Sequence, residues 1–369
     1  MEKELRVIVS GGGTGGHIFP AISIANAIKA KHPEAKILFI GALGRMEMQR
    51  VPQAGYEIKG LPVKGLVRPL YSLKNIIVGI DFLRSKFMAK RIVRKFKPDV
   101  AVGVGGYASA AALDAAQALG VPCLIQEQNS YAGKTNKLLA NGAKKICVAY
   151  NGMERFFPAD KIIMTGNPVR QNVVNDNISK QEARKKFGLD PDKKTILLVG
   201  GSLGARTIND SMRLHLKEVK DANVQFIWQT GKYYNAEMNK AVSDFGEISN
   251  LKVLDFITDM GAAYNAADLV ISRAGASSIS EFCLIGKPVI LVPSPNVAED
   301  HQTKNAMALV NKDAAIYVKD AEAPEVLLKR ALTIVNDDEK LKSLSENIKK
   351  LGLPNSADVI ADEVLKLVR

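Results

Sequence analysis

Short apolar segments alternate with helical patterns along the whole sequence. The strand candidates are residues 5–10, 36–40, 99–103, 121–126 and 145–149 in the first half, and residues 195–199, 224–229, 251–256, 268–272, 288–292 and 314–318 in the second. Most of them are apolar throughout, which is typical of parallel strands covered on both faces. Because this rhythm occurs twice in 369 residues, the sequence predicts an α/β protein with two Rossmann-like, doubly wound parallel sheets.

A polar stretch without a sustained apolar pattern, residues 175–192, separates the two halves. On either side of it the same arrangement recurs. RVIVSGGGTGGH near the start and TILLVGGSLGAR at residues 195–206 each read as an apolar strand, a glycine turn and a helix. We therefore place the boundary near residues 166–170, which gives domains of residues 1–169 and 170–354. The cleft between two such sheets is the expected ligand site, because the carboxyl ends of the strands carry the loops.

Four glycine-containing turns join a predicted strand to a predicted helix. They are Gly11–His17, Gly103–Tyr107, Gly200–Ala205 and Arg273–Glu281. Such a turn presents free backbone N–H groups and the positive end of a helix, and glycine lets a phosphate approach closely. One turn alone is weak evidence, since glycine also serves tight strand–helix packing. Four turns drawn from both halves predict an anionic ligand.

The first turn matches the dinucleotide fingerprint G-x-G-x-x-G through Gly11, Gly13 and Gly16. A nicotinamide dinucleotide also requires an acidic residue at the end of the second strand, to bind the ribose hydroxyls. The segment 36–40 is followed by Gly-Ala-Leu, and no acid occurs before Glu47. A dinucleotide oxidoreductase is therefore disfavoured.

The second half offers a better nucleotide site. Glu281 lies in the helix after the segment 268–272, where a ribose-binding acid belongs. We expect the ribose on Glu281 and the phosphates at the helix starts formed by Ser202 and residues 276–278. The first glycine turn would then face this nucleotide from across the cleft.

Three side chains are candidates for the chemistry. His17 ends the first turn at a helix start, where the positive helix end favours a neutral imidazole able to accept a proton. Glu127 follows an apolar strand and is the second candidate base, with Asn129 expected in the same cleft. Arg170, at the domain crossover, is the candidate to neutralise a diphosphate leaving group. The alternatives are loop hydrogen bonds for the first two and an interdomain ion pair for Arg170.

The net positive charge comes entirely from the first half. Residues 1–169 hold 24 lysines and arginines against 11 acids, whereas residues 170–369 hold 27 of each, so the first half accounts for the net charge of +13. A field this one-sided points to an anionic partner, either nucleic acid or an acidic membrane surface.

A basic amphipathic segment at residues 71–96 favours the membrane. Its apolar residues share one helical face and bases surround that face, with Ile76, Ile80, Leu83 and Phe87 in the stripe and Lys86, Lys90 and Arg94 among the bases. Such a stripe is typical of a helix that lies in an anionic membrane interface. A core helix with a solvated basic face is the alternative. Because the segment interleaves aliphatic rather than aromatic side chains, no nucleic acid partner is expected.

Metal chemistry has little support in the sequence. Three cysteines lie far apart in apolar surroundings, and no His or Cys pair has the spacing of metal ligands. Residues 190–192, Asp-Pro-Asp, have the form of a metal-binding D-x-D but lie in a proline turn before a strand, so they are read as a turn. We expect no metal and no cofactor, and no apolar run reaches the roughly 18–20 residues of a membrane span.

Seven motifs, taken together, resemble a known family. SGGGTGGHIFPA, GVGGYAS, QEQNSYAGKTNK, TGNPVR, GGSLGAR, SRAGASSISE and DHQTKNA occur in the order and spacing of the MurG family of N-acetylglucosaminyltransferases, within glycosyltransferase family 28. The resemblance covers essentially the full chain. It implies the GT-B fold, with two Rossmann-like domains facing a central cleft and a last helix, at about residues 355–369, that returns to the first domain.

The resemblance also implies an activity. The family transfers GlcNAc from UDP-GlcNAc, with inversion, to the C4 hydroxyl of MurNAc in lipid I (undecaprenyl-pyrophosphoryl-MurNAc-pentapeptide). The product is lipid II, for peptidoglycan synthesis and cell wall biogenesis. The family works as a peripheral protein on the cytoplasmic face of the cell membrane. The expected partners are therefore UDP-GlcNAc, lipid I and an anionic membrane surface.

Residue roles follow from the matching motifs. The resemblance assigns UDP-GlcNAc contacts to Thr14, Gly15, Gly16, Asn129, Arg170, Ser202, Ile257, Ala276, Ser277, Ser278, Ile279, Ser280, Glu281 and Gln302. His17 and Glu127 are the acid/base candidates, and Gly105, Gly106 and Tyr107 are expected at the acceptor pyrophosphate. The family often has His-Glu-Gln-Asn where this chain begins with Gln126, so the proton acceptor is expected at His17 first.

Three other functions remain open from the sequence. A diacylglycerol sugar transferase would share the fold and the donor site and would differ in its acceptor. A UDP-GlcNAc epimerase would convert the donor without any acceptor and would need no membrane-facing helix. A UDP-sugar sensor would bind the donor and release no UDP.

Overall fold

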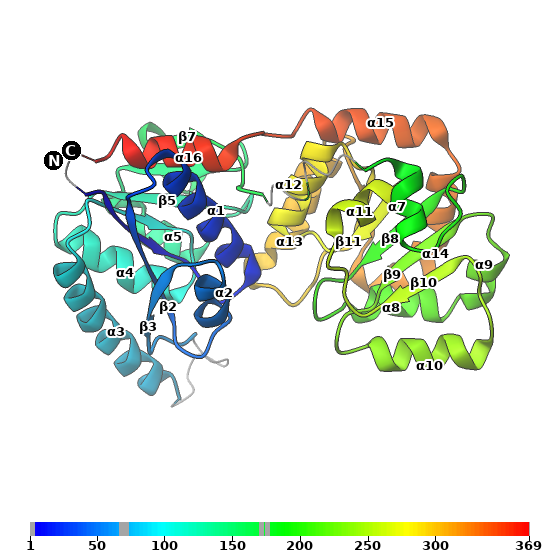
Figure 1. The fold of residues 1–369 in the computed structure, drawn as a ribbon, viewed down its shortest axis with the longest axis horizontal. Coiled ribbons are helices and arrows are strands. Elements are labelled where there is room, and N and C mark those ends of the chain that lie inside the picture. The colour runs from blue at the N-terminus through cyan, green and yellow to red at the C-terminus, as the bar shows by residue number, and fades with distance from the viewer. Residues whose placement is uncertain (1–3, 66–73, 170–172, 174–177, 369) are drawn as a thin grey trace. The chain divides into compact units, whose positions relative to one another are not determined.

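The structure is a computed structural model that describes residues 4–65, 74–169, 173 and 178–368 (Figure 1). Its contacts divide the chain into two compact units. Unit 1 comprises residues 1–169 and 353–369, and unit 2 comprises residues 170–352.

Unit 1 is built on a seven-stranded sheet in the order β3-β2-β1-β4-β5-β6-β7. All neighbouring strands pair in parallel. The strands are β1 (Arg6–Ser10), β2 (Lys36–Ala42), β3 (Glu57–Leu61), β4 (Val100–Gly103), β5 (Cys123–Glu127), β6 (Lys145–Val148) and β7 (Ile162–Met164). The central strands are buried along their length because both faces of the sheet are covered.

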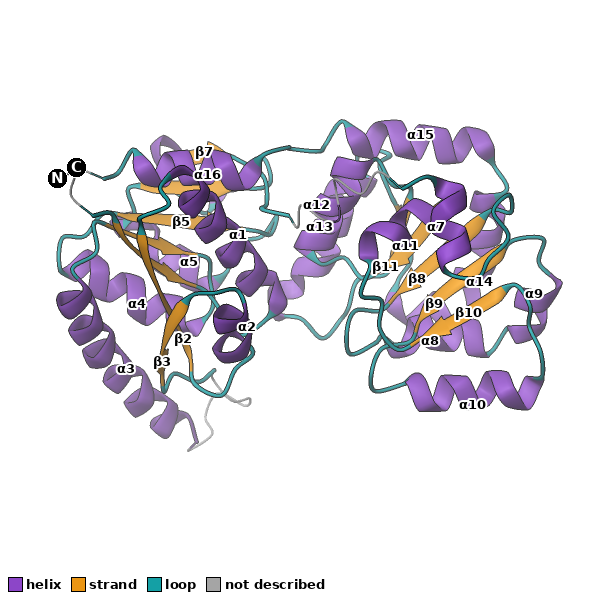
Figure 2. Cartoon of the chain, viewed as in Figure 1, coloured by secondary structure: helices purple, strands orange, loops and turns teal. Residues whose placement is uncertain are grey.

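Helices lie on both faces of this sheet (Figure 2). They are α1 (Gly15–Lys31), α2 (Glu47–Gln53), α3 (Lys74–Phe96), α4 (Tyr107–Ala118), α5 (Lys134–Leu139), α16 (Ser356–Leu365) and the 3₁₀ turns η1 (Ala140–Gly142), η2 (Met153–Arg155) and η3 (Ala159–Lys161). One hydrophobic cluster joins α3 and α4 to the sheet, and a second joins α1 and α16 to its other face. The latter pair lies side by side, with Ile360 and Val364 fully buried.

Unit 2 repeats the arrangement with a six-stranded sheet in the order β10-β9-β8-β11-β12-β13, again parallel throughout. Its strands are β8 (Thr195–Val199), β9 (Gln225–Gln229), β10 (Leu251–Leu254), β11 (Leu269–Ser272), β12 (Val289–Leu291) and β13 (Ile316–Tyr317). Its helices are α7 (Lys180–Lys186), α8 (Arg206–Arg213), α9 (Leu216–Asp221), α10 (Asn235–Phe245), α11 (Met260–Ala266), α12 (Ala276–Ile285), α13 (His301–Val310), α14 (Ala323–Val335), α15 (Asp338–Lys349) and the turns η4 (Ala298–Asp300) and η5 (Asp320–Glu322).

The predicted fold class is confirmed, and so is every strand expected from an apolar run. Two strands were not predicted, and both are edge strands of unit 1. β3 alternates polar and apolar residues around Gly60, and β7 has only 3 residues. An edge strand has one exposed flank and carries fewer buried side chains, so its sequence signal is weaker. No described helix combines the length and hydropathy that crossing a bilayer requires.

Candidate functional site

The four predicted glycine turns lie at equivalent places in the two sheets. β1 and β4 are neighbours in unit 1, and the turns that follow them are Gly11–His17 and Gly103–Tyr107. β8 and β11 are neighbours in unit 2, and they are followed by Gly200–Ala205 and Arg273–Glu281. Each pair flanks the point where the strand order reverses, which is where open α/β sheets bind ligands.

In unit 1 the carboxylate of Glu47 accepts a hydrogen bond from the first glycine turn. Glu47, at the start of α2, is fully buried. Its Oε2 accepts from the Gly13 amide at 3.0 Å and its Oε1 accepts from the Ala42 amide at 3.0 Å. A dinucleotide pyrophosphate would have to displace this negative charge from the glycine turn. The contact agrees with the sequence argument against a nicotinamide cofactor, and the sequence did not reveal it.

The imidazole of His17 is oriented by the same turn. Its Nδ1 lies 3.0 Å from the carbonyl oxygen of Gly12 and 3.4 Å from Thr14 Oγ1. A carbonyl oxygen only accepts, so Nδ1 carries the proton and Nε2 is the nitrogen able to accept one. A Cβ placed on Gly105 would lie 2.9 Å from Nε2, so glycine keeps room beside this nitrogen. The geometry suits His17 to proton abstraction.

The second turn of unit 1 packs directly on the first. The Gly12 amide donates to the Gly105 carbonyl at 3.3 Å. Gly106 has a φ of +89°, and a Cβ there would lie 2.5 Å from the Gly12 carbonyl oxygen, so no other residue fits without a backbone shift. Tyr107 begins α4 with 53% of its surface exposed. Of the predicted pyrophosphate candidates, Gly105 thus lies beside His17 and Gly106 beside Gly12.

The second candidate base, Glu127, is held by four donors. It is 1% exposed at the end of β5. Its Oε1 accepts from the backbone and side-chain amides of Asn129, at 3.1 and 3.3 Å. Its Oε2 accepts from the Gly133 amide at 2.9 Å and from Asn136 Nδ2 at 2.8 Å. A carboxylate saturated in this way orders residues 129–136, and this arrangement favours His17 over Glu127 as the base.

A network of buried amides fixes the loops around Glu127. Gln126 Nε2 donates to Asn167 Oδ1 at 2.9 Å, and Asn167 Nδ2 donates to the Gln128 carbonyl at 3.0 Å. Gln128 Nε2 donates to the Val104 carbonyl at 2.9 Å and also to Gln126 Oε1. Gln126 thus connects neighbouring loops of unit 1 instead of facing solvent, consistent with its exclusion as a catalytic group.

In unit 2 the first turn exposes Gly201 and Ser202 to solvent, whereas Gly200 and Gly204 are half-buried. The turn is fixed to the loop that follows β9, because the backbone carbonyl oxygen of Ser202 accepts from the Lys232 amide at 3.1 Å. Gly204 has a φ of +90°, and a Cβ there would lie 2.2 Å from the Thr230 carbonyl oxygen. Glycine is therefore required by the approach of two backbones, and Ser202 remains exposed at the strand end.

The second turn of unit 2 leads into α12, which contains most of the predicted donor contacts. Ser277 Oγ, in the first turn of this helix, is buried without a hydrogen-bond partner in the described structure. Ser280 Oγ instead donates to the Ala276 carbonyl at 3.0 Å, and Ser278 is half-buried while Ile279 is buried. An unpaired hydroxyl beside the free N–H groups of a helix start is suited to an anion.

Glu281 lies in the second turn of α12 and is 2% exposed. Its Oε2 accepts from the hydroxyl of Tyr264 at 3.2 Å. Tyr264 stacks edge-on against Phe282, with ring centroids 5.4 Å apart. The tyrosine, which the sequence did not suggest, fixes the orientation of the predicted ribose-binding carboxylate.

The remaining donor candidates are distributed over three loops. The side chain of Ile257 is buried, at 4% exposure, next to Phe256 at 53%. Gln302 Oε1 accepts from the Ser294 amide at 2.8 Å at the start of α13. Thr14 and Gly16 are exposed in the first turn of unit 1, and Gly15 is half-buried. Arg170 lies outside the described residues.

A further unpredicted group links the two turns of unit 2. Arg273, directly after β11, donates to Thr207 Oγ1 at 3.2 Å and to the Val292 carbonyl at 3.0 Å, and it pairs with Asp320. Thr207 in turn donates to Asp320 at 2.6 Å. The arginine is committed to these partners and holds the starts of α8 and η5 beside the end of β11.

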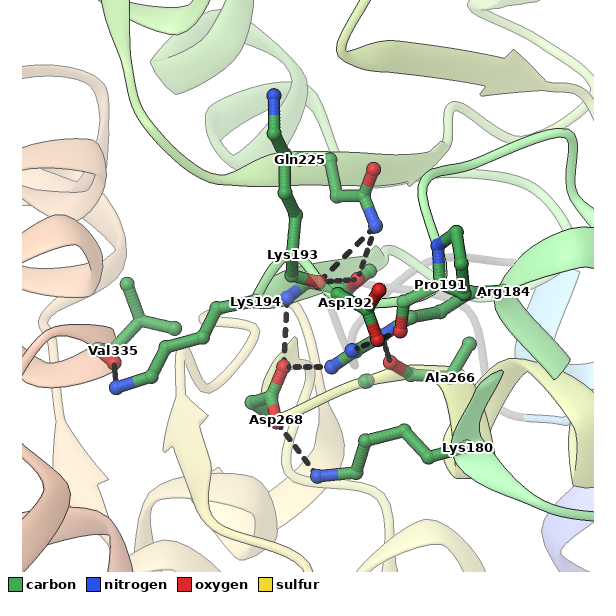
Figure 3. Close-up of polar contacts among 12 residues, drawn as sticks. Lys180, Arg184, Pro191, Asp192, Lys193, Lys194, Gln225, Ala266, Asp268 and Val335 are labelled. Atoms are coloured by element: carbon green, nitrogen blue, oxygen red, sulfur yellow. Dashed lines mark hydrogen bonds and ion pairs between the residues drawn. The ribbon is translucent and has the colours of Figure 1, made fainter. Parts of the chain in front are cut away.

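A charged cluster lies at the amino ends of the central strands β8 and β11, opposite the carboxyl ends that carry the glycine turns (Figure 3). Asp268 accepts from Lys180 Nζ, from Arg184 NH2 and from the Thr195 amide, each at 2.7 Å. Arg184 is 4% exposed and also donates to the Pro191 carbonyl at 2.8 Å. This cluster binds the amino ends of β8 and β11 and is a stabilising element distant from the strand ends that carry the glycine turns.

A pocket of about 520 Å³ lies on unit 2 between α9 and α14. It contains none of the predicted site residues. Its lining combines apolar and charged side chains, namely His215, Glu218, Glu325, Leu328, Lys329, Leu332, Thr333 and Asn336. In the described part of the chain, no three His, Cys, Asp or Glu side chains are grouped to hold a metal ion.

The predicted apolar stripe of α3 is exposed. Ile76, Ile80 and Leu83 have 62%, 60% and 60% of their surface accessible, and Phe87 has 76%. The opposite face of the helix is buried through Val78, Ala89 and Val93, which are 7%, 0% and 1% exposed. Arg94 is exposed, Lys90 is half-buried, and Lys86 forms an ion pair with Asp114 at 2.9 Å. The alternative of a core helix therefore applies only to the inner face.

Comparison with known proteins identifies the family. The glycosyltransferase family 28 N-terminal domain matches residues 7–148, and the C-terminal domain of that family matches residues 195–360. A protein of Bacteroides thetaiotaomicron is 67% identical over 368 residues, covering 100% of this chain and 99% of its own. Its name is UDP-N-acetylglucosamine--N-acetylmuramyl-(pentapeptide) pyrophosphoryl-undecaprenol N-acetylglucosamine transferase.

Solved structures agree with this assignment. The crystal structure of MurG from Acinetobacter baumannii matches with a TM-score of 0.80 at 28% identity, covering 98% of this chain and 99% of that one. A UDP-GlcNAc 2-epimerase from Neisseria meningitidis matches with a TM-score of 0.67 at 16% identity, covering 98% and 100%, and shares the fold alone. With both domains matched and two thirds of its residues identical to those of a full-length relative, the chain belongs to glycosyltransferase family 28.

Proposed function

We propose that this glycosyltransferase transfers GlcNAc from UDP-GlcNAc to the C4 hydroxyl of MurNAc in lipid I, producing lipid II for peptidoglycan synthesis. The observation that carries the proposal is the 67% identity, over the full chain, to a transferase named for this donor and acceptor. The glycine turns at the reversal points of both sheets provide the anion-binding groups that a nucleotide diphosphate and a lipid pyrophosphate require.

The nucleotide of the donor is assigned to unit 2. The diphosphate binds at the start of α12, where Ser277 has an unpaired hydroxyl, and at the turn that contains Ser202. Glu281 accepts hydrogen bonds from the ribose hydroxyls, with Tyr264 holding its carboxylate. The partial positive charge of the helix ends stabilises the diphosphate as it leaves, and Arg170 is assigned to the same role.

The proton acceptor is assigned to unit 1. The acceptor C4 hydroxyl attacks the anomeric carbon from the face opposite UDP, so the C–O bond to UDP breaks as the new glycosidic bond forms. Nε2 of His17 takes the hydroxyl proton, and the electron pair of the broken bond leaves with UDP. The acceptor pyrophosphate is assigned to Gly105, Gly106 and Tyr107, of which Gly105 lies beside this nitrogen.

Release of UDP tests the proposal against its rivals. The protein is incubated with UDP-GlcNAc alone, with a lipid I analogue added, and with diacylglycerol added. We expect UDP release and a GlcNAc-containing lipid only with the lipid I analogue. Transfer to diacylglycerol, epimerisation without acceptor, or binding without any UDP release would each replace the proposal with the corresponding alternative.

Replacing Glu281 with glutamine tests the donor site. A hydrogen bond to a charged group contributes about 1.5–3 kcal/mol, so KM for UDP-GlcNAc is expected to rise by roughly tenfold to a hundredfold. Glutamine retains an acceptor for the Tyr264 hydroxyl, which limits the structural change. Glu218→Gln, at an exposed carboxylate on α9 of the same unit, is the control and should leave KM unchanged. An unchanged KM in Glu281→Gln would remove the ribose from this residue.

We also propose that the exposed face of α3 attaches the protein to the cytoplasmic face of the cell membrane. The apolar stripe and the exposed bases beside it support this placement. Each base near an anionic surface contributes about 1 kcal/mol, so the double substitution Lys90→Glu and Arg94→Glu should weaken vesicle binding at least about 30-fold.

Flotation with vesicles containing anionic lipid measures this effect, and added salt should weaken binding in the unmodified protein. The control is Lys217→Glu with Lys342→Glu, at two exposed lysines of unit 2. Equal loss of binding in both double variants would show that net charge, and not this face of α3, determines attachment.

A further inference from the structure

Glu47 is a buried carboxylate that the proposed mechanism does not use. It originates in α2, yet its two oxygens accept from amides at the ends of two different strands, Gly13 beyond β1 and Ala42 at the end of β2. Both hydrogen bonds measure 3.0 Å. A carboxylate with 0% exposure is stable only with such partners, because burying an unpaired charge is costly. The carboxylate therefore connects the first glycine turn, after β1, to the carboxyl end of β2.

Two glycines make room for this side chain. A Cβ on Gly12 would lie 2.1 Å from Glu47 Oε1, and a Cβ on Gly41 would lie 2.7 Å from its Cγ. Neither glycine has the positive φ that would explain it by backbone conformation. The central glycine of the G-G-G run is thus required by a protein carboxylate, in a place where the dinucleotide pattern would reserve the space for a ligand phosphate.

The same short turn orients the catalytic imidazole. Gly12 has Glu47 on the side where its Cβ would be, and its carbonyl oxygen accepts from His17 Nδ1 at 3.0 Å. Gly13, the next residue, donates its amide to the carboxylate. The peptide group between Gly12 and Gly13 therefore contacts both side chains: its carbonyl oxygen selects the tautomer of His17, and its amide donates to Glu47.

We propose that Glu47 is a positioning residue for the transfer reaction. It holds the turn Gly11–Thr14 in the conformation that keeps the proton on Nδ1 of His17 and leaves Nε2 to accept the proton of the acceptor hydroxyl. The inference rests on the proposed role of His17 as the base.

The variant Glu47→Gln tests the inference. Glutamine has nearly the same shape, but its NH₂ group must face one of the two amides, which also donate. A shift of about 1 Å in a catalytic group can cost about a hundredfold in rate, so kcat should fall tenfold to a hundredfold. The KM for UDP-GlcNAc should stay within about twofold, because the nucleotide, which provides most of the assigned donor contacts, is assigned to unit 2. Glu47→Asp keeps the charge, provides a second variant should the first fail to fold, and is expected to lose less.

Asp99→Asn is the matched control. Asp99 also accepts from a backbone amide of β1, that of Arg6 at 2.9 Å, but at the opposite end of the strand. Both variants are expected to lower the unfolding temperature, whereas only Glu47→Gln should lower kcat beyond this common effect. A similar fall in kcat in both variants would reduce Glu47 to a stabilising group and overturn the inference.

A double variant separates positioning from general damage. If Glu47 acts through His17, then His17→Ala combined with Glu47→Gln should be no slower than His17→Ala alone. Additive losses would overturn the inference.

The tautomer can be observed without any substrate. The chain has four histidines, so ¹⁵N-labelled imidazoles can be assigned with His17→Ala. We expect a protonated Nδ1 in the unmodified protein and a mixture of tautomers in Glu47→Gln. The same tautomer in both would overturn the inference even if the proposed acceptor were correct. An absence of transfer in the unmodified protein would instead overturn the proposed function.

Discussion

His17→Ala is expected to lower kcat by about 10²–10⁴-fold, the usual loss when a positioned general base is removed. Nδ1 of the imidazole is held by the Gly12 carbonyl, so the variant loses an oriented acceptor at Nε2 and not a mobile side chain. Binding of UDP-GlcNAc should persist, because the nucleotide is assigned to unit 2. Steady-state UDP release with a lipid I analogue gives kcat, and calorimetric titration gives the donor Kd.

His32→Ala provides the matched control. His32 is exposed and caps the other end of α1, so its loss tests whether a histidine-to-alanine change in this helix is harmful in itself. We expect this variant to retain its kcat. If His17→Ala also turned over at the normal rate, the base would have to be sought elsewhere, with Glu127 as the next candidate.

Asp268→Asn is expected to destabilise unit 2 by about 3 kcal/mol, the lower end of the cost of removing one partner of a buried ion pair. The substitution leaves the buried guanidinium of Arg184 without its counter-charge (Figure 3). For a unit of this size the unfolding temperature should fall by roughly 6–12 °C. Donor binding well below that temperature should be unchanged, because the cluster lies at the amino ends of the strands and the glycine turns lie at their carboxyl ends. Thermal unfolding and donor titration measure the two effects.

Asp338→Asn is the control for this prediction. Asp338 pairs with Lys194 at 2.6 Å, but its side chain is 85% exposed, and exposed pairs contribute only about 0–1 kcal/mol. Equal destabilisation by both variants would contradict the assigned importance of burial at Asp268.

The buried ion pair between Asp268 and Arg184 also predicts how stability depends on pH. Burial raises the pKa of Asp268, but hydrogen bonds from Lys180 and the Thr195 amide and the charges of Lys180 and Arg184 outweigh it, so the net pKa lies below its ordinary value. The folded state therefore prefers the ionised form. Its contribution is present above the ordinary aspartate pKa of about 3.9 and is lost as the pH falls through the lower folded value. The difference in unfolding temperature between the unmodified protein and Asp268→Asn should close below about pH 4.

Sequence patterns predicted the strands best where burial is complete. β8 was expected at residues 195–199 and lies there, because a run of five side chains buried or nearly so has no polar alternative. β3 was not predicted, because its alternating polar and apolar residues and its glycine are also typical of a loop. The four glycine turns were found because strand, glycine and helix are all local features. Their pairing at the two reversal points depends on strand order, which no local pattern contains.

The directions in which side chains point at the strand ends could not be predicted from the sequence. Glu127 was expected to face the ligand, but the four donors around it come from residues 129, 133 and 136, which only the folded loop brings together. In the sequence, Glu47 lies beyond the position at which a ribose-binding acid is expected. Its contact with Gly13 requires the chain to turn back through α2, and that return depends on packing and not on spacing.

The packing of α16 against α1 has a consequence for how the protein emerges from the ribosome. The core that covers one face of the unit 1 sheet includes Ile360, Ala361 and Val364, more than 200 residues after Cys147, the last strand residue of that core. Unit 2, residues 170–352, is synthesised in between, so its strands and helices all emerge before α16. The unit that begins earlier therefore completes its core later, and until then its nascent sheet exposes an apolar face that chaperones can bind.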